Sequence, residues 1–214
     1  MNKAEDEVSR ATPRARQRAA TEAEILEVAL AQMGSHGVAA LNLSEVARQV
    51  GLRQPSLFRY FPSRLALYDA LFAQGMRAHR DAVAAALAQG SGGWATVRAV
   101  VDATARFSVG NPVLAQLLFT RPVPGFVPSA EAYAPSLEVF EMVAGAVAEA
   151  VAVGDLAAEA ATPDGVQLLV AVAAGVISQQ AANDPDAGEP SPLLGTALEM
   201  YASFYRPGSA RHKA

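Results

Sequence analysis

Residues Gly51–Phe61 read GLRQPSLFRYF, in which a glycine precedes a short segment of mixed polar and apolar side chains. The residues just before it form a second short amphipathic segment, and we expect helices over 42–50 and 54–60. Asn42 and Glu45 have the spacing of a helix N-terminal cap, and Pro55 lies in the first turn of the second segment. Two short helices joined by a tight glycine turn have the length and spacing of a helix-turn-helix.

The apolar residues of these two segments suit one small core shared with the helix expected before them. Ala47 is small, and Gly51 supplies the backbone conformation that lets the helices cross steeply. Phe58 is also expected in the core rather than in contact with a partner. We expect the remaining core residues to be Ile25, Leu26, Ala29, Val46, Val50, Leu52, Leu57 and Phe61.

That orientation leaves a polar set of side chains outward on the second helix. Such a helix fits the major groove of DNA, where glutamine and arginine can read base edges. Serine, tyrosine and arginine side chains can bind phosphates there. The outward residues are Gln54, Pro55, Ser56, Arg59 and Tyr60.

The net charge of −4 is unevenly distributed over the 214 residues. Residues 9–68 hold eight arginines against four glutamates, whereas residues 69–214 hold eight basic and fourteen acidic side chains. Such asymmetry favours contact of the first part with a polyanion, although a merely solvated face would give the same count.

Composition excludes several classes of function. The chain has no cysteine, so disulfides and thiolate zinc sites are absent. The longest apolar run, Leu168–Ile177, is too short to span a bilayer, and the first residues lack the apolar core of a signal peptide. We therefore expect a soluble, cytoplasmic protein with no membrane contact and no cofactor.

Nearly the whole chain has helical periodicity, so the expected fold class is all-α. The first helix is expected to begin at Pro13, behind Thr12, or at Thr21, where Thr21 and Glu24 make a capping box. Two proline-rich or polar loops, at 121–129 and 183–190, interrupt the later helices. Further helices are expected over about 64–89, 94–109, 112–120, 130–151, 163–182 and 191–205.

A set of residues spread over about 21–68 forms a recognisable pattern. They are Ile25-Leu-Glu-Val-Ala29, Gly37, Leu41-Asn-Leu43, Val46-Ala47, Gly51-Leu52, Leu57-Phe-Arg-Tyr-Phe-Pro-Ser-Arg64 and Leu67. In this pattern the chain resembles the TetR family of transcriptional regulators.

The resemblance implies three regions and a set of DNA contacts. They are a flexible arm over 1–20, a helix-turn-helix DNA-binding domain over 21–68, and a helical-bundle domain for effector binding and dimerisation over 69–214. Arg10, Arg14, Arg16 and Arg18 form either a DNA-binding arm or a solvated tail. The expected DNA-binding residues are Asn42, Arg53, Gln54, Pro55, Ser56, Arg59, Tyr60 and Arg64.

The sequence departs from the family pattern at several of these positions. Arg53 stands where the family usually has a capping serine or threonine, so it loses a cap and gains a charge. Phe58 replaces a tyrosine and so lacks its hydroxyl. Arg64 replaces a lysine, and Asn42 replaces a threonine cap.

The family's effector pocket and dimer interface lie in the helical domain. Charge is scarce between Asp81 and Glu131, which favours a largely apolar ligand. The expected pocket residues are Trp94, Phe107, Leu114, Leu118, Phe119, Phe126, Tyr133, Phe140 and Met142, with Gln179 and Asn183 as polar contacts; for each aromatic residue a plain core position is the alternative. The expected homodimer interface is Leu168, Leu169, Val172, Val176, Leu194, Leu198, Tyr201 and Phe204, for which an intradomain core is the alternative.

These expectations describe a repressor that a small ligand releases from a palindromic operator. The alternative is a helical scaffold or protein-interaction module with a degenerate helix-turn-helix. An enzyme is not expected, because no Glu-x-x-His, H-E-x-x-H or G-x-S-x-G motif occurs, and we expect no catalytic residue and no metal site. The segment Gly90-x-Gly92-x-x-Ala95 loosely matches a dinucleotide-binding fingerprint. Because a helix rather than a strand precedes it, we expect a flexible loop there.

Overall fold

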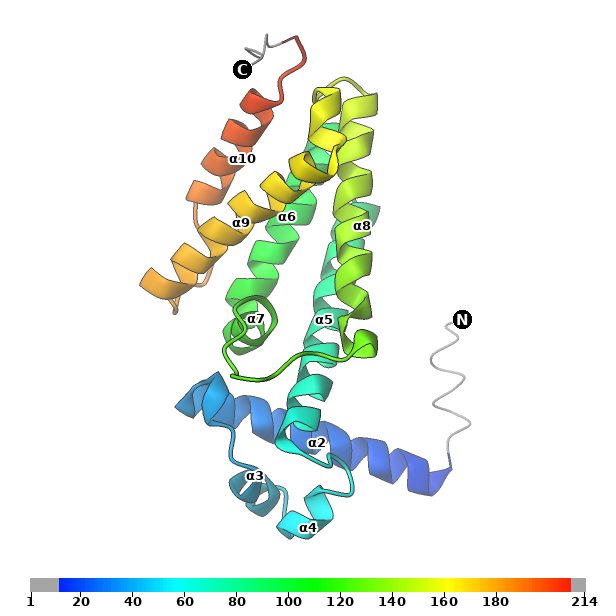
Figure 1. Cartoon of the computed structure of the whole chain (residues 1–214), viewed down its shortest axis with the longest axis vertical. Helices are drawn as coiled ribbons and strands as arrows, with labels where there is room; N and C mark the ends of the chain where they lie inside the picture. Colours follow the sequence, from blue (N-terminus) through cyan, green and yellow to red (C-terminus); the bar gives the residue numbers. More distant parts are fainter. Residues whose placement is uncertain (1–11, 209–214) are drawn as a thin grey trace.

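The computed structural model describes residues 12–208, which are helical with no strand in that range. A small end formed by α2 to α4 joins a larger helical bundle through the long helix α5 (Figure 1). The expected all-α fold, with its N-terminal helix-turn-helix followed by a bundle, is confirmed. The helices are α2 (Pro13–His36), η1 (Val38–Ala40), α3 (Leu43–Gln49), α4 (Gln54–Leu57), α5 (Arg64–Ala88), α6 (Gly93–Gly110), α7 (Pro112–Phe119), α8 (Ala130–Ala152), η2 (Ala158–Ala161), α9 (Pro163–Asn183) and α10 (Leu193–Phe204).

Helix α2 begins at the earlier of the two expected starts. The Thr12 hydroxyl accepts a hydrogen bond from the backbone N–H of Ala15 at 3.2 Å, and Pro13 occupies the first turn. Thr21 lies inside the helix and donates to the carbonyl of Gln17, so it is not a cap. The flexible arm expected over residues 1–20 is therefore wrong for residues 13–20; Arg10 and the rest of that arm lie outside the described residues.

The turn between α3 and α4 follows from Gly51. Its φ of 73° places it in the left-handed region that glycine adopts without strain. The N–H of Gly51 donates to the carbonyl of Arg48, and the N–H of Leu52 donates to the carbonyl of Ala47 at 2.8 Å. These two bonds form a Schellman motif, which satisfies the last carbonyls of α3 and turns the chain toward α4.

Helix α4 is shorter than the expected 54–60. After Leu57 the backbone bonds span three residues: Arg59 donates to Ser56 and Tyr60 donates to Leu57. The chain therefore tightens into turns before Phe61. Phe58 is 40% exposed, so its expected place in the core is wrong, whereas Leu57 and Phe61 are buried.

The helix-turn-helix end has its own apolar core, which reaches into the bundle. Ile25, Ala29, Val46, Leu57 and Leu67 are fully buried there. The same cluster continues through α5 to residues of α7 and α8. The two ends of the molecule are thus packed together rather than joined by a bare linker.

Helix α5 connects the two ends. The Ser63 hydroxyl accepts from the N–H of Ala66 at 3.0 Å and fixes its start. The buried Tyr68 hydroxyl donates to the carbonyl of Val38 at 2.6 Å and ties the helix to η1. Further along, a Cβ at Gly75 would lie only 3.1 Å from a Leu114 methyl and 3.2 Å from a Leu118 methyl, so the glycine lets α7 pack closely on α5.

The far end of the bundle is held by polar contacts between distant segments. A carboxylate oxygen of Asp155, in the loop after α8, accepts from the N–H of Trp94 at 2.8 Å and so caps the start of α6. The Tyr201 hydroxyl of α10 donates to the carbonyl of Gly165 in α9. Trp94 stacks on Tyr201 with ring centres 5.9 Å apart, which joins α6 to α10.

Within residues 12–208, α9 alone is long and apolar enough to cross a membrane by length and composition. Only 22% of its most apolar window is buried inside the chain. One such helix is weak evidence for a membrane span, because a helix that pairs with another protein surface has the same composition.

We predict that Gly75→Val lowers the free energy of unfolding by about 1–3 kcal/mol, because the added methyl groups overpack the Leu114 and Leu118 contact. Gly145→Val is the matched control, since Gly145 is also inside a helix but has nothing within 4 Å of an added Cβ. Urea unfolding of the three proteins measures the difference. Equal losses for both variants would contradict the close approach of α7 to α5.

Candidate nucleic-acid interface

The structure brings the eight expected DNA-binding residues to one end of the molecule. They lie at the start of α3, along α4 and at the start of α5 (Figure 1). Ser56 and Tyr60 are half-buried. The exposed members are Asn42, Arg53, Gln54, Pro55, Arg59 and Arg64.

Asn42 fixes the start of α3, as expected. Its side-chain oxygen accepts from the N–H groups of Ser44 (3.0 Å) and Glu45 (3.3 Å). Its own N–H donates to the side-chain oxygen of buried Gln32 at 2.6 Å. We did not expect Gln32 to hold the start of α3. Its position one residue before Met33, on the buried face of α2, could have indicated this role.

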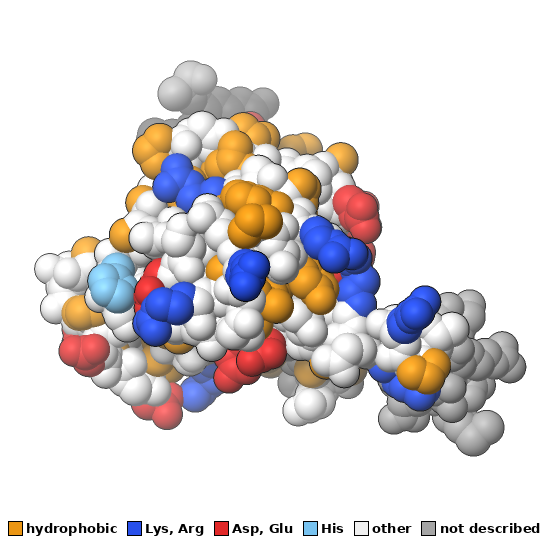
Figure 2. Space-filling view, turned by 90° about the horizontal axis from the view of Figure 1, so that it is seen from below, with side chains coloured by type: hydrophobic (Ala, Val, Ile, Leu, Met, Phe, Trp, Pro, Cys, Tyr) orange, Lys and Arg blue, Asp and Glu red, His pale blue; other side chains and the backbone are white. Residues whose placement is uncertain are grey.

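The arginines at this end divide into paired and unpaired groups. Arg48 donates to Glu45 at 2.8 Å, and this contact, helped by Gln49, lowers the pKa of Glu45 to about 2. Arg18 is paired with Glu22 at 2.8 Å. Within the described range, Arg53, Arg59 and Arg64 have no ion pair, so their guanidinium groups remain available to an anion. Figure 2 views the molecule from below and shows basic side chains spread among apolar, uncharged and acidic ones.

The early start of α2 brings one arginine of the expected arm to the end of α4. The guanidinium of Arg18 lies 5.3 Å from the centre of the Tyr60 ring. It also donates to the carbonyl of Arg59 at 3.3 Å. Arg18 therefore braces the turn that carries Arg59 and Tyr60, a role for which the sequence offered no signal.

Arg53 stands at the N-terminal cap of α4, and its side chain makes no capping hydrogen bond. The loss of the cap expected from the sequence is therefore confirmed. The side chain is exposed and has no ion pair among the described residues.

In the helical domain, a buried histidine lies between two of the expected pocket residues. His79 of α5 is 4% exposed, and its ring centre is 5.1 Å from that of Phe107 and 5.4 Å from that of Phe119. Its Nε2 is 3.0 Å from the Thr104 hydroxyl, while Nδ1 has no hydrogen-bond partner. Burial lowers the pKa of His79 to about 4, so the ring is neutral near pH 7.

The other expected pocket residues are not brought together around one cavity. Leu114 and Leu118 pack on α5 at Gly75, while Phe126 and Tyr133 contact Phe72. Trp94 lies at the far end of the bundle, and Phe140 is 41% exposed. The Asn183 amide donates to the carbonyl of Gln179 at 2.7 Å, so these two polar candidates meet only at the end of α9.

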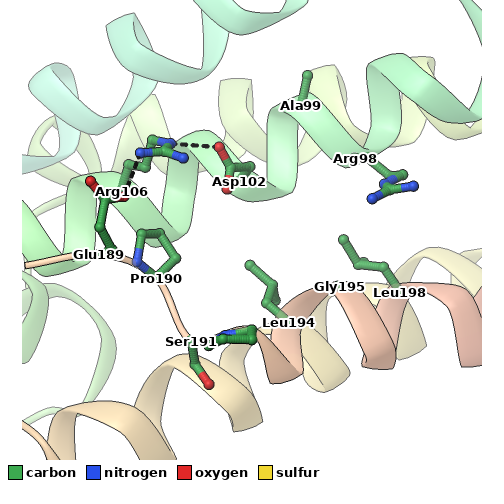
Figure 3. Close-up of a pocket in the computed structure, with 11 residues that line it drawn as sticks. Arg98, Ala99, Asp102, Arg106, Glu189, Pro190, Ser191, Leu194, Gly195 and Leu198 are labelled. Carbon is green, nitrogen blue, oxygen red and sulfur yellow. Dashed lines mark hydrogen bonds and ion pairs between the residues drawn. The ribbon is translucent and has the colours of Figure 1, made fainter. Parts of the chain in front are cut away.

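Two open hollows stand out on the surface of residues 12–208. One, of about 450 Å³, lies between α5 and α8 and includes Met142 with Glu138, Glu141 and Glu149. The other, of about 370 Å³, lies between α6 and α10 (Figure 3). In this second hollow Arg106 is paired with Asp102 at 2.7 Å and with Glu189 at 2.8 Å, so these three charged side chains already have partners. In residues 12–208 no group of three or more His, Asp or Glu side chains is arranged to hold a metal ion.

The eight expected interface residues of α9 and α10 fall on two faces. Leu169, Leu194, Leu198 and Tyr201 are buried in the core of their own chain, as the alternative explanation held. Val172 and Val176 are half-buried. Leu168 and Phe204 are exposed, at 40% and 56%.

Two exposed residues that we did not single out extend this surface. Leu193 is 56% and Met200 is 69% exposed, and they lie on the same face of α10 as Phe204. Their spacing of seven and four residues is the helical signal that could have separated them from the buried set. We call the exposed residues Leu168, Leu193, Met200 and Phe204 the α9–α10 apolar face.

Comparisons with known proteins agree with this geometry. Residues 25–71 match the sequence model of the family described as bacterial regulatory proteins, tetR family. HTH-type transcriptional regulator Mb1846 of Mycobacterium bovis is 30% identical over 145 residues, which are 63% of this chain and 59% of that protein. The matched region thus spans less than two thirds of that relative.

Solved structures share the fold over most of the chain. The putative regulatory protein SCO4313 is 24% identical, with a TM-score of 0.71 over 89% of this chain and 98% of that one. A TetR family transcription regulator from Marinobacter aquaeolei VT8 is 19% identical, with a TM-score of 0.65 and the same coverage. Mb1846, SCO4313 and the Marinobacter protein are each named as a regulator.

We predict that His79 makes the protein less stable as pH falls. Its pKa is lower in the folded state than its ordinary 6.5, so the unfolded chain binds the proton first. Stability is therefore lost as pH falls from about 6.5 toward 4, by about 2 kcal/mol between pH 7.5 and 5. Urea unfolding at the two pH values should show this loss for the wild type and for His36→Gln, and a smaller one for His79→Gln. An identical pH dependence in all three proteins would show that His79 does not cause it.

Proposed function

We propose that the chain is a TetR-type, sequence-specific DNA-binding transcriptional regulator, because residues 25–71 match the sequence model of bacterial regulatory proteins, tetR family. It binds a palindromic operator as a homodimer, represses transcription there, and is released by a small, largely apolar ligand. It works in the cytoplasm and lies on the nucleoid while bound to its operator.

The observation that carries this proposal is the set of exposed polar groups on and around α4. Gln54, Arg53, Arg59 and Arg64 are exposed within one short stretch of chain, and the three arginines have no ion pair among the described residues. Helix α4 is held rigidly behind them by the Schellman turn at Gly51 and by buried Leu57. Unpaired arginines on either side of a fixed short helix suit phosphate and base-edge contacts.

The α9–α10 apolar face supports the homodimer. Large apolar side chains that are 40–69% exposed on two adjacent helices are costly in a monomer. Exposed Ala171, Ala174 and Gly175 on α9 leave room for the close approach of a second helix pair. A two-fold dimer would place two copies of α4 about 34–36 Å apart, one turn of DNA.

The surroundings of His79 support a ligand site in the bundle. The unpartnered Nδ1 is a polar group that a ligand could satisfy, and Phe107 and Phe119 supply apolar walls. Helix α7, which carries Phe119, packs on α5 and α6 and also on α2 and η1. A ligand that moves α7 would therefore shift the helix-turn-helix end, with a coupling of about 1–3 kcal/mol typical of such regulation.

Selection from a random duplex DNA library tests the function itself. We expect the purified protein, at moderate salt and without ligand, to enrich an inverted repeat whose half-sites are one helical turn apart. A library that stays random would instead support the alternative, a helical scaffold with a degenerate helix-turn-helix. The enriched duplex would then serve to screen ligands by release of the protein.

Arg59→Ala is predicted to weaken operator binding and to flatten its salt dependence. Removal of one phosphate contact should lower the slope of log K against log salt by about one. Arg77→Ala is the control, because Arg77 is an exposed arginine of α5 outside the proposed surface. Titrations at several salt concentrations measure both quantities. An Arg59→Ala protein with wild-type affinity and slope would remove Arg59 from the interface.

Met200→Glu is predicted to dissociate the homodimer, because it places a charge in the α9–α10 apolar face. Sedimentation should give twice the 22.2 kDa chain mass for the wild type and a shift toward that single mass for the variant. Leu137→Glu controls for a general effect of charge, since Leu137 is 56% exposed on α8. A monomeric wild type, or a dimeric Met200→Glu protein, would place any interface elsewhere.

A further inference from the structure

A hydrogen bond joins the two short helices on their exposed side. The hydroxyl of Ser44 donates to the side-chain oxygen Oε1 of Gln54 at 2.9 Å. Ser44 is the second residue of α3 and Gln54 is the first residue of α4, and both are exposed. The bond therefore links the start of one helix to the residue that opens the other.

Both partners of this bond are fixed from behind. The N–H of Ser44 is held by Asn42, whose own N–H is held by buried Gln32. The backbone around Gln54 is held because Ser56 donates to the carbonyl of Arg53 at 2.8 Å and Leu57 is buried. The amide of Gln54 is thus oriented by a chain of contacts that begins in the protein core.

The bond decides what the Gln54 amide can offer. A free glutamine pairs with adenine by accepting from N6 and donating to N7. In Gln54 the bond from Ser44 uses one lone pair of the oxygen and holds that oxygen beside α3, while the two N–H donors have no partner among residues 12–208. The neighbouring O6 and N7 atoms of guanine are both acceptors in the major groove, so they match an amide that presents donors.

We propose that Ser44 is a specificity-determining residue that acts through Gln54, setting it to prefer guanine over adenine at one position of each half-site. The proposal rests on the DNA-binding function proposed above and on the exposure of Gln54 at the end of the molecule that carries it. Ser44 positions the reading group, and Gln54 makes the base contact.

Library selection with five proteins tests the proposal. We expect the wild type to enrich guanine at one position of each half-site. Ser44→Ala frees the Gln54 oxygen, so the preference at that position should shift from guanine toward adenine by about tenfold. Ser44→Thr keeps a hydroxyl and should restore guanine, while Gln54→Ala should accept any base there. Ser35→Ala is the matched control, because its hydroxyl is bonded within α2, to the carbonyl of Ala31.

Further measurements separate positioning from direct contact and from loss of structure. Ser44→Ala added to Gln54→Ala should change no base preference, because Ser44 acts only through Gln54. The melting temperature of Ser44→Ala should match that of the wild type within a few degrees.

Three results would overturn the proposal while leaving the DNA-binding function intact. They are a wild-type preference for adenine at the Gln54 position, a Ser44→Ala preference identical to that of the wild type, and a Ser44→Ala effect that persists without Gln54. A wild-type protein that enriches no site at all would overturn both the DNA-binding function and this refinement of it.

Discussion

The hydrogen bond from Tyr68 to the carbonyl of Val38 is the constraint on which the arrangement of the two ends depends. It lies fully inside the protein, where an unpaired carbonyl would be costly, and it joins the first turns of α5 to the segment between α2 and α3. Because α5 continues without a break into the bundle, the helix-turn-helix and the bundle are attached to one rod. The core that contains Tyr68 also includes Val46 of α3 and Leu57 of α4.

The exposed end is defined as much by the contacts its side chains already make as by their chemical type. Arg48 and Arg18 carry the same charge as Arg53 and Arg59, but carboxylates of their own helices neutralise them. Ser44 bonds to the oxygen of the Gln54 amide and so leaves both of its N–H donors open to a partner. Internal pairing thus selects, from a surface rich in arginine, the few groups that can meet an external partner.

The sequence predicted the fold well, because local signals agree with the packing. Gly51, Asn42 and Ser63 mark helix ends by simple backbone chemistry, and the structure uses each of them in that way. The sequence predicted α4 less well. The helical pattern of residues around Phe58 does not show that the backbone changes to tighter turns after Leu57.

Side-chain partners across the fold could not be predicted from the sequence. The contacts Ser44–Gln54 and Arg18–Tyr60 join residues ten or more positions apart, and only the tertiary arrangement creates them. On α10, Leu193 and Met200 are exposed while Leu194 and Leu198 are buried; helical spacing separates the two sets, but the packing of α9 decides which set faces outward. The helices and the exposed helix-turn-helix therefore follow from local sequence. The expected pocket residues do not line one cavity, because their positions depend on contacts with residues distant in the chain.

Trp94 is the single tryptophan of the protein and stacks on Tyr201 of α10. The chain therefore carries an intrinsic fluorophore at the junction of α6 and α10, whose emission will report displacement of α10 without any attached label.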